Sequence, residues 1–226
     1  GAQPSEDSNI GLVSWGGWMS NEAAFGYASL VPVCIAPSLF KRIDLDDIRI
    51  NLFKKYENSG NKEPHLSDDV YNALPRYASL KFRPYKGNYT DMNIGSHSAY
   101  PLMRVEEMYL IKAEAEAMGG NLSGGKSTLE NFVRTYRDPS FTSKANSAQD
   151  FQDEVWLQRR MELWGEGFSL FDILRLKKPV VRKNTNYDPS VQYNSAAEAQ
   201  ILIYRIPQCE METNSGISDT DNNPAA

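Results

Sequence analysis

The sequence predicts a mainly α-helical protein built from helical hairpins of tetratricopeptide type, with long irregular loops and a few short strands. A long apolar helix is predicted over residues 101–118, because Pro101 suits a first helical turn and Gly119-Gly120 suit the position just past a helix end. Shorter helical patterns follow it, separated by polar stretches rich in Gly, Asn and Ser. Because a clean repeat of about 34 residues is missing, we expect an irregular helical array.

The region before this helix, residues 1–99, is predicted to be loop-rich and aromatic. Its beginning shows no clear periodicity, so we expect only short turns there. A short helix over residues 45–49 is predicted to lead into a strand, and the alternating pattern of residues 76–85 predicts a second strand. The polar residues 54–66 and 86–99 are expected to form exposed loops.

Residues 100–178 are predicted to form the helical framework. The first helix carries a wide apolar face, which needs neighbours on more than one side. That face consists of Leu102, Val105, Met108, Tyr109, Ile111, Ala113 and Ala115. Further helices are predicted over residues 126–136, 151–164 and 168–177, with Ser147 to Asp150 capping the middle one. Their expected inward positions are Leu129, Phe132, Val133, Tyr136, Phe151, Val155, Met161 and Trp164.

Residues 179–226 are predicted to form a surface loop followed by an extended C-terminal segment. The loop is expected over residues 180–200, where Asn, Ser and Tyr are frequent. Residues 201–206 predict a buried strand, and the polar residues after them are expected to be frayed. We treat residues 1–226 as one region, because a chain of 226 residues can bury a sizeable core.

Composition argues against several classes of function. The 41% hydrophobic content excludes global disorder, and no apolar run of about 18 residues is present to span a membrane. A net charge of −5 without a basic cluster argues against nucleic acid as a partner. The two histidines, His65 and His97, lie in polar loops, so we expect neither His-based catalysis nor a metal or cofactor site. Cys34 and Cys209 either form a disulfide or remain free thiols.

Four motifs follow one another in the second half of the chain. They are RVEEMYLIKAEA from Arg104, NFVRTYR from Asn131, RRMELWGEGFSLFDILR from Arg159 and IPQCEMETN from Ile206. This order resembles the SusD/RagB family, whose corresponding patterns are R-x-x-E-x-Y-L-x-x-A-E-A, N-x-V-R-x-R, E-R-R-x-E-x-x-x-E-G-x-R-x-x-D-L-x-R and I-P-x-x-E-x-x-x-N. In that family the motifs belong to the C-terminal part. The resemblance therefore implies a SusD-like C-terminal region, present here as a fragment or as a short member.

Two positions depart from the family pattern. Gln158 stands where the family often has Glu, and Ser169 stands where it usually has Arg. Each replacement removes a charge from an expected ion network. We therefore expect that network to be thinner in this chain.

The charged residues of these motifs are predicted to form a structural ion network. Glycoside hydrolysis needs two carboxyl groups about 5 to 10 Å apart at a cleft. With 29 acidic residues, however, some pair always meets that distance. Ion pairs between packed helices explain these acids better, because arginines lie near them in sequence. The predicted network consists of Arg104, Glu107, Glu114, Arg159, Arg160, Glu162, Glu166, Asp172 and Arg175, and no catalytic residue is predicted.

Aromatic rings in the loops are the predicted ligand contacts. Sugars are held by stacking on flat rings, with polar side chains around the rim. Trp15 and Trp18 flank two glycines in a loop that offers little core, whereas the helical Trp156 and Trp164 are expected to fill the core. The predicted ligand-binding residues are Trp15, Trp18, Tyr27, Tyr85 and Tyr89.

The family resemblance implies a non-catalytic role at the cell surface. SusD-like proteins are outer-membrane lipoproteins of Bacteroidetes-type bacteria that bind an oligosaccharide or another nutrient and cover a SusC-like TonB-dependent transporter. Membrane contact is then expected only through a lipid anchor outside this chain. Two alternatives stay open. One is a helical module that only docks to the transporter, and the other is a glycan-cleaving enzyme that depends on one specific carboxylate.

Overall fold

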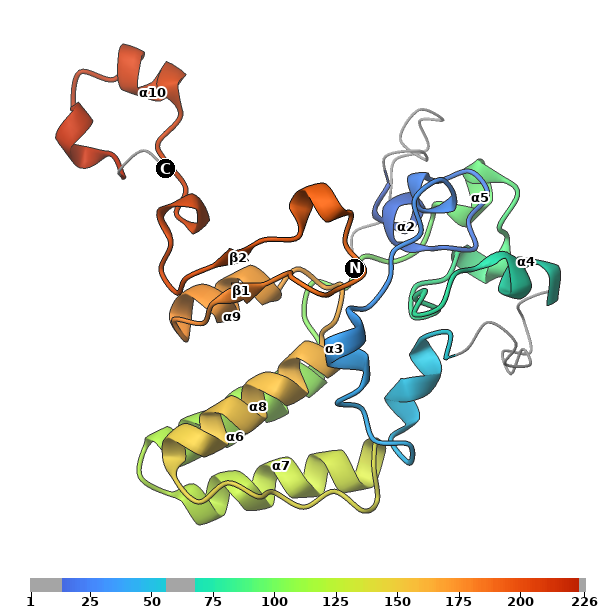
Figure 1. Cartoon of the computed structure of the whole chain (residues 1–226), viewed down its shortest axis with the longest axis horizontal. Helices are drawn as coiled ribbons and strands as arrows, with labels where there is room; N and C mark the ends of the chain where they lie inside the picture. Colours follow the sequence, from blue (N-terminus) through green and yellow to red (C-terminus); the bar gives the residue numbers. More distant parts are fainter. Residues whose placement is uncertain (1–13, 56–67, 224–226) are drawn as a thin grey trace. The chain divides into compact units, whose positions relative to one another are not determined.

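The computed structural model describes residues 14–55 and 68–223 of the chain (Figure 1). Its described part is mainly helical, as the sequence predicts. The chain divides into two compact units, Gly1–Glu166 and Gly167–Ala226. Most of the turn predicted over residues 54–66, including His65, lies outside the described residues.

Short helical pieces occupy the first part of the first unit, where η denotes a 3-10 helix. In chain order they are α2 (Trp15–Met19), η1 (Tyr27–Ser29), α3 (Pro37–Phe40), η2 (Ile48–Leu52), α4 (Asp68–Ala73), η3 (Tyr85–Gly87) and α5 (Met92–Gly95). The loop-rich character predicted for this region is therefore present, although it contains more helical turns than expected.

Neither strand predicted for this region forms. The 3-10 helix η2 begins at Ile48 and extends to Leu52, where the strand was expected, and its N-cap Asp47 accepts a hydrogen bond from the Arg49 N–H at 2.9 Å. The segment over residues 76–85 makes isolated bridges only, because Tyr77 has a φ of 71°, which breaks the extended backbone. The alternating apolar residues there are buried against a loop-rich core and do not belong to a β-sheet.

Three helices form the framework: α6 (Val105–Met118), α7 (Leu122–Tyr136) and α8 (Ala148–Glu162). In Figure 1, α6 runs beside α8, and α6 also packs against α7. α6 begins after Arg104, whose extended backbone is the N-cap, and not at residue 101. Gly120 has a φ of 95° and ends the helix region as predicted. Ser147 caps α8 by accepting a hydrogen bond from the Asp150 N–H at 3.0 Å, as expected.

The apolar side chains between these helices make one continuous core. It consists of Leu110, Ala113, Ala117, Leu129, Phe132, Val133, Ala145, Phe151 and Val155. The wide apolar face predicted for α6 is wrong in its direction, because only Ala113 of that set is buried and Val105 is 64% exposed. Small residues on the packed side let the helices approach, so burial follows Leu110, Ala113 and Ala117. Tyr136, expected inside, is exposed.

A second core lies under the loop-rich part of the first unit. It contains Ile35, Leu39, Ile43, Ile50, Phe53 and Met161. Trp164 is half-buried and packs its ring edge-to-face on Phe53, with centroids 5.1 Å apart. Met161 joins α8 to this core, so the loop-rich part and the framework are packed together.

The second unit contains the short helices α9 (Ser169–Arg175) and α10 (Gln208–Thr213) and one small antiparallel pair of strands. β1 (Val180–Val181) pairs with β2 (Asn194–Ser195) within the segment predicted to be loop. The predicted buried strand over residues 201–206 is wrong, because its start is a 3-10 turn and Ile201 is exposed. Across residues 14–55 and 68–223, the helices are too short or too polar to cross a bilayer.

Candidate ligand-binding site

The short helix α2 directs its two tryptophans to different surroundings. Ser14 caps α2 by accepting a hydrogen bond from the Gly17 N–H at 3.0 Å, so the Ser-Trp-Gly-Gly-Trp sequence becomes helical. Trp15 packs edge-to-face on Phe82 and Tyr100, with centroids 4.5 and 5.3 Å away. The two rings of the Trp pair therefore do not form one platform.

Trp18 forms a separate exposed pair with Tyr27. Their rings are stacked, with centroids 4.8 Å apart and an interplanar angle of 28°, and they are 51% and 43% exposed. The backbones that carry them touch closely, since a Cβ added to Gly26 would lie 2.1 Å from the Gly17 carbonyl oxygen. Only glycine at position 26 allows this approach.

Trp15 and Tyr85 share a cleft of about 740 Å³ with Tyr100. The polar side chains of Arg83, Lys86 and Ser98 lie along the same lining. Two of the five predicted aromatic residues are thus brought together here. Tyr100, which lies directly before the helix predicted over residues 101–118, also lines the cleft, although it is not among the predicted ligand-binding residues. Its position before Pro101 was the signal that could have indicated a loop residue.

Tyr89 lies apart from both aromatic groups. Its backbone carbonyl accepts a hydrogen bond from the Ala24 N–H at 2.9 Å, and this ties the loop after Tyr85 to the segment before Tyr27. Its side chain is exposed and does not belong to the lining of the cleft. Tyr89 therefore stays a prediction without a place in either group.

A buried carboxylate, Glu162, holds the centre of the ion network. It accepts hydrogen bonds from Arg137 at 2.7 and 2.8 Å, from Arg104 at 3.1 Å and from Arg49 at 3.5 Å. Burial raises the pKa of Glu162, but the hydrogen bonds from Arg137 and the charges of the three arginines outweigh burial and lower the pKa from 4.5 to about 2. Glu162 is therefore ionised at neutral pH.

A second carboxylate, Glu166, connects this network to the cleft. It accepts hydrogen bonds from Lys81 and, at 2.9 Å, from Arg104 Nε. Lys81, Arg104 and Glu166 all belong to the cleft lining. Burial lowers the pKa of the Lys81 ammonium, although the hydrogen bond to Glu166 acts in the opposite direction. The wall of the cleft is therefore made of paired charges.

Other predicted members of the network make separate contacts on the framework helices. Arg159 pairs with Glu107 at 3.5 Å, and Glu114 accepts a hydrogen bond from Gln152 at 2.9 Å. Both contacts join α6 to α8, as expected for ion pairs and hydrogen bonds between packed helices. Arg104 does not pair with Glu107, although the two lie one turn apart.

Three further members of the predicted set have contacts of their own. Arg160 lies over the ring of Trp156, with the guanidinium carbon 5.0 Å from the ring centroid. Asp172 and Arg175 pair with each other at 2.9 Å within the second unit. Arg104 joins Glu162 and Glu166 directly, by ion pairs of 3.1 and 2.9 Å.

Three cations of the network were missing from the predicted set: Arg49, Lys81 and Arg137. Arg49 is paired with Asp47 at 2.6 Å and also donates to Gln158 Oε1 at 2.7 Å. The amide of Gln158 thus keeps a hydrogen bond to this arginine without adding a charge. The Asp-Ile-Arg sequence at 47–49 was the available signal, but no local pattern indicates a partner more than 100 residues away.

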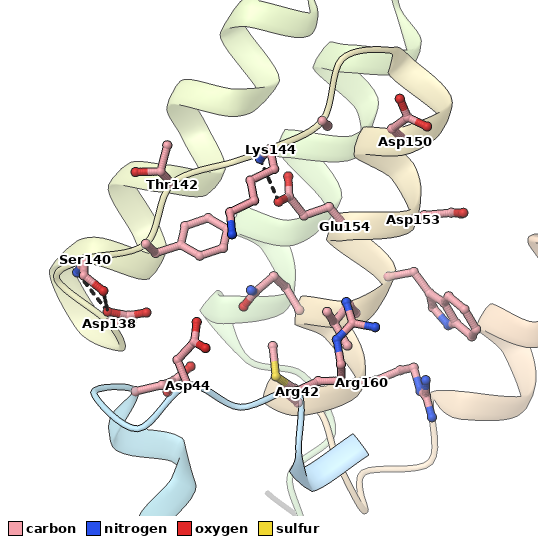
Figure 2. A pocket seen from close by; sticks show the side chains of 17 residues that line it. Arg42, Asp44, Asp138, Ser140, Thr142, Lys144, Asp150, Asp153, Glu154 and Arg160 are labelled. Carbon is pink, nitrogen blue, oxygen red and sulfur yellow. Dashed lines mark hydrogen bonds between the residues drawn. The ribbon is translucent and has the colours of Figure 1, made fainter. Parts of the chain in front are cut away.

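A second cavity, of about 780 Å³, is mostly polar and lies beside α8 (Figure 2). Two carboxylates that line this cavity accept hydrogen bonds from the connection between α7 and α8. Asp138 accepts hydrogen bonds from Ser140, and Glu154 accepts one from the Lys144 backbone N–H at 3.1 Å. None of the predicted ligand-binding aromatic residues lines this cavity.

No site for a metal is built by the described residues, which contain no group of three His, Cys, Asp or Glu side chains suited to an ion. Cys34 and Cys209 are both free thiols, and burial raises the pKa of the Cys34 thiol. His97 meets the Tyr85 ring edge-on, with centroids 6.5 Å apart.

The protein is thus a helical scaffold, and the irregular loops before its long helices carry an aromatic cleft. The model of the SusD family matches residues 54–223, and the chain belongs to this family. No protein with a curated description matches the chain. The predicted family and the mainly helical SusD-like fold are therefore confirmed.

Three solved structures show the same fold. A SusD-like carbohydrate binding protein from Bacteroides vulgatus is 22% identical, with a TM-score of 0.66 over 100% of this chain and 49% of its own. A SusD superfamily protein from the same species is 24% identical, with a TM-score of 0.70 over 99% and 45%. A SusD superfamily protein from Bacteroides thetaiotaomicron is 25% identical, with a TM-score of 0.59 over 83% and 39%. The chain therefore spans half or less of their length.

Proposed function

We propose that this chain is part of a non-catalytic protein that binds an oligosaccharide or another nutrient. The cleft around Trp15, Tyr85 and Tyr100 carries this proposal. Aromatic faces stack on the C–H faces of sugars, and polar side chains beside them bond to hydroxyl groups. A volume of about 740 Å³ lies within the range of about 300–1,000 Å³ that small-molecule sites occupy. One relative with the same fold is described as a carbohydrate binding protein.

The state of the nearby carboxylates supports binding without turnover. A general acid needs a pKa near the working pH, whereas the pKa of Glu162 is about 2. Glu166 is bonded to both Lys81 and Arg104, so its oxygens are occupied by the framework. A glycoside hydrolase needs one carboxyl group that can protonate the leaving group and a second one that is free to act as base or nucleophile.

Membership of the SusD family supports a cellular setting for the proposed binding event. We propose that the full-length protein is a lipid-anchored lipoprotein on the outer-membrane surface of a Bacteroidetes-type bacterium. Its partner would be a SusC-like TonB-dependent transporter, to which the captured nutrient is handed over. Nucleic acid is not expected as a partner, because the chain carries a net charge of −5.

A screen of neutral and acidic oligosaccharides against the purified chain tests the proposal, with Tyr85→Ala and Trp18→Ala as paired variants. Both side chains are partly exposed, so the fold should tolerate either change. Binding in the cleft predicts that Tyr85→Ala lowers affinity about tenfold and that Trp18→Ala leaves it unchanged. The reverse pattern would move the site to the Trp18–Tyr27 pair. A folded sample that binds no glycan would refute the proposal for this chain.

The exposed side of α6 favours one second candidate, a module that docks on a partner protein. Met108, Ile111 and Met118 lie on one side of this helix and are all exposed. A docking module predicts no glycan binding and a pull-down of the transporter that Ile111→Glu abolishes. Glycan binding that Ile111→Glu leaves intact would favour the first proposal.

A further inference from the structure

Three cations of the aromatic cleft, Lys81, Arg83 and Arg104, are partly buried and are paired with carboxylates, most of which are more buried than the cations. Arg104 is 25% exposed in its side chain, but its partners Glu162 and Glu166 are 4% and 2% exposed. The same arrangement recurs at the next pair, where Arg83 is 24% exposed and Glu22 is 6% exposed. In these pairs the cation is the more exposed member, whereas Glu106, which also pairs with Arg104 at 3.1 Å, is 24% exposed.

Lys86 adds a cation at the edge of the cleft. The Lys86 Nζ lies 5.2 Å from the centroid of the Tyr85 ring. Within residues 14–55 and 68–223, Lys86 forms no ion pair. Of the described residues that line the cleft, four carry a positive charge and one carries a negative charge. They are Lys81, Arg83, Lys86, Arg104 and Glu166. This lining is positive within a chain whose net charge is −5.

Aromatic rings and cations together line this cleft, and the two kinds of side chain favour one class of ligand. A neutral sugar would gain from the rings and from hydroxyl contacts but not from the positive field. A carboxylate or sulfate group accepts charge-assisted hydrogen bonds from guanidinium and ammonium groups. Because the cations lie beside Trp15 and Tyr85, one oligosaccharide could stack on a ring and place its acidic group on a cation.

We infer that the cleft takes an anionic oligosaccharide that carries carboxylate or sulfate groups. This inference rests on the proposed function and narrows its ligand. Glu166 lines the cleft beside Lys81 and Arg104 and offsets part of their charge, so the exposed Lys86 at the edge of the cleft makes the main contribution to the attraction. Attraction of this kind weakens as salt is added, which separates it from ring stacking.

The test uses the purified chain on an array of acidic oligosaccharides and neutral ones, including oligogalacturonates and their methyl esters. Esterification removes the carboxylate charge and keeps the sugar rings, so each pair isolates the contribution of charge. We expect binding to acidic members that falls at least fivefold on esterification. We also expect calorimetric affinity to fall when NaCl is raised from about 50 to about 500 mM.

The substitution Lys86→Gln tests whether the acidic group of the oligosaccharide binds in this cleft. It should weaken acidic-glycan binding about fivefold and leave the fold intact, because Lys86 is exposed. Lys112→Gln is the matched control, since Lys112 is an exposed lysine of α6 outside the cleft, and it should change nothing. Unchanged acidic-glycan binding by Lys86→Gln would refute the location in this cleft.

The remaining outcomes separate this inference from the proposed function. If neutral oligosaccharides or methyl esters bind as tightly as the acidic forms, the inference is wrong and the proposed function stands. If a folded chain binds no oligosaccharide of either kind, both are wrong. Preference for acidic members that disappears at high salt supports both.

Discussion

Acidification should weaken the fold through Glu162. This carboxylate has a pKa of about 2 in the folded protein, against 4.5 for an ordinary glutamate, because three arginines surround it. A lowered pKa contributes stability above the unfolded value and loses it as the pH falls through the folded value. The difference corresponds to about 3 kcal/mol at neutral pH, of which about 2 kcal/mol is lost by pH ~3.

Urea unfolding of the wild type and Glu162→Gln between pH ~7 and ~3 measures this contribution. The variant should be less stable by about 3–5 kcal/mol at pH ~7, because Arg49, Arg104 and Arg137 lose their shared partner. Its stability should then fall less than that of the wild type on acidification. Should Glu162→Gln not fold, Arg137→Gln is the second variant and should start its acid unfolding at higher pH. Equal acid losses in wild type and both variants would refute the reasoning.

Three other changes give expected outcomes on stability. Gly26→Ala should destabilise the protein by about 1–3 kcal/mol and alter the near-UV circular dichroism of the Trp18–Tyr27 pair, because its Cβ would lie 2.1 Å from the Gly17 carbonyl oxygen. Gly16→Ala, whose Cβ would meet Ser98 at an ordinary 3.6 Å, is its control in thermal melts, and equal effects of both would contradict the contact. Leu110→Ala should cost about 2–5 kcal/mol in urea unfolding, whereas Ile111→Ala on the exposed side should cost under about 1 kcal/mol, and a reversed order would place the core on the other face of α6. Ser147→Ala should cost about 1 kcal/mol through the lost cap of α8, and an unchanged melting temperature would show that the cap contributes nothing.

Local sequence patterns predicted the helices of the framework because their signals are local. Gly120 marks the end of α6 by its own backbone preference, and Ser147 marks the start of α8 by a hydrogen bond three residues ahead. The direction of the packed face of α6 was not predictable in the same way. Several of its faces carry apolar residues, so only the positions of α7 and α8 decide that Leu110 is inside and Val105 outside.

The strands were predicted wrongly for a related reason. Alternating apolar residues describe burial on one side, and a strand also needs a neighbouring chain to complete its hydrogen bonds. Residues 76–85 meet the first condition only, since their partners at Cys34 and Phe53 give isolated bridges. The small pair β1–β2 forms within a polar segment where the alternation is absent.

The sequence by itself determined the family, the helical class, the end of α6 and the N-cap of α8, because ordered motifs, caps and glycines act over a few residues. It also predicted that aromatic residues of the loops contact the ligand. Only the tertiary structure decided that Trp15 shares a cleft with Tyr85 and Tyr100 whereas Trp18 stacks on Tyr27, and that Glu162 pairs with Arg49, Arg104 and Arg137. These contacts join residues far apart along the chain, and the closure of the fold, not any local preference, brings them together.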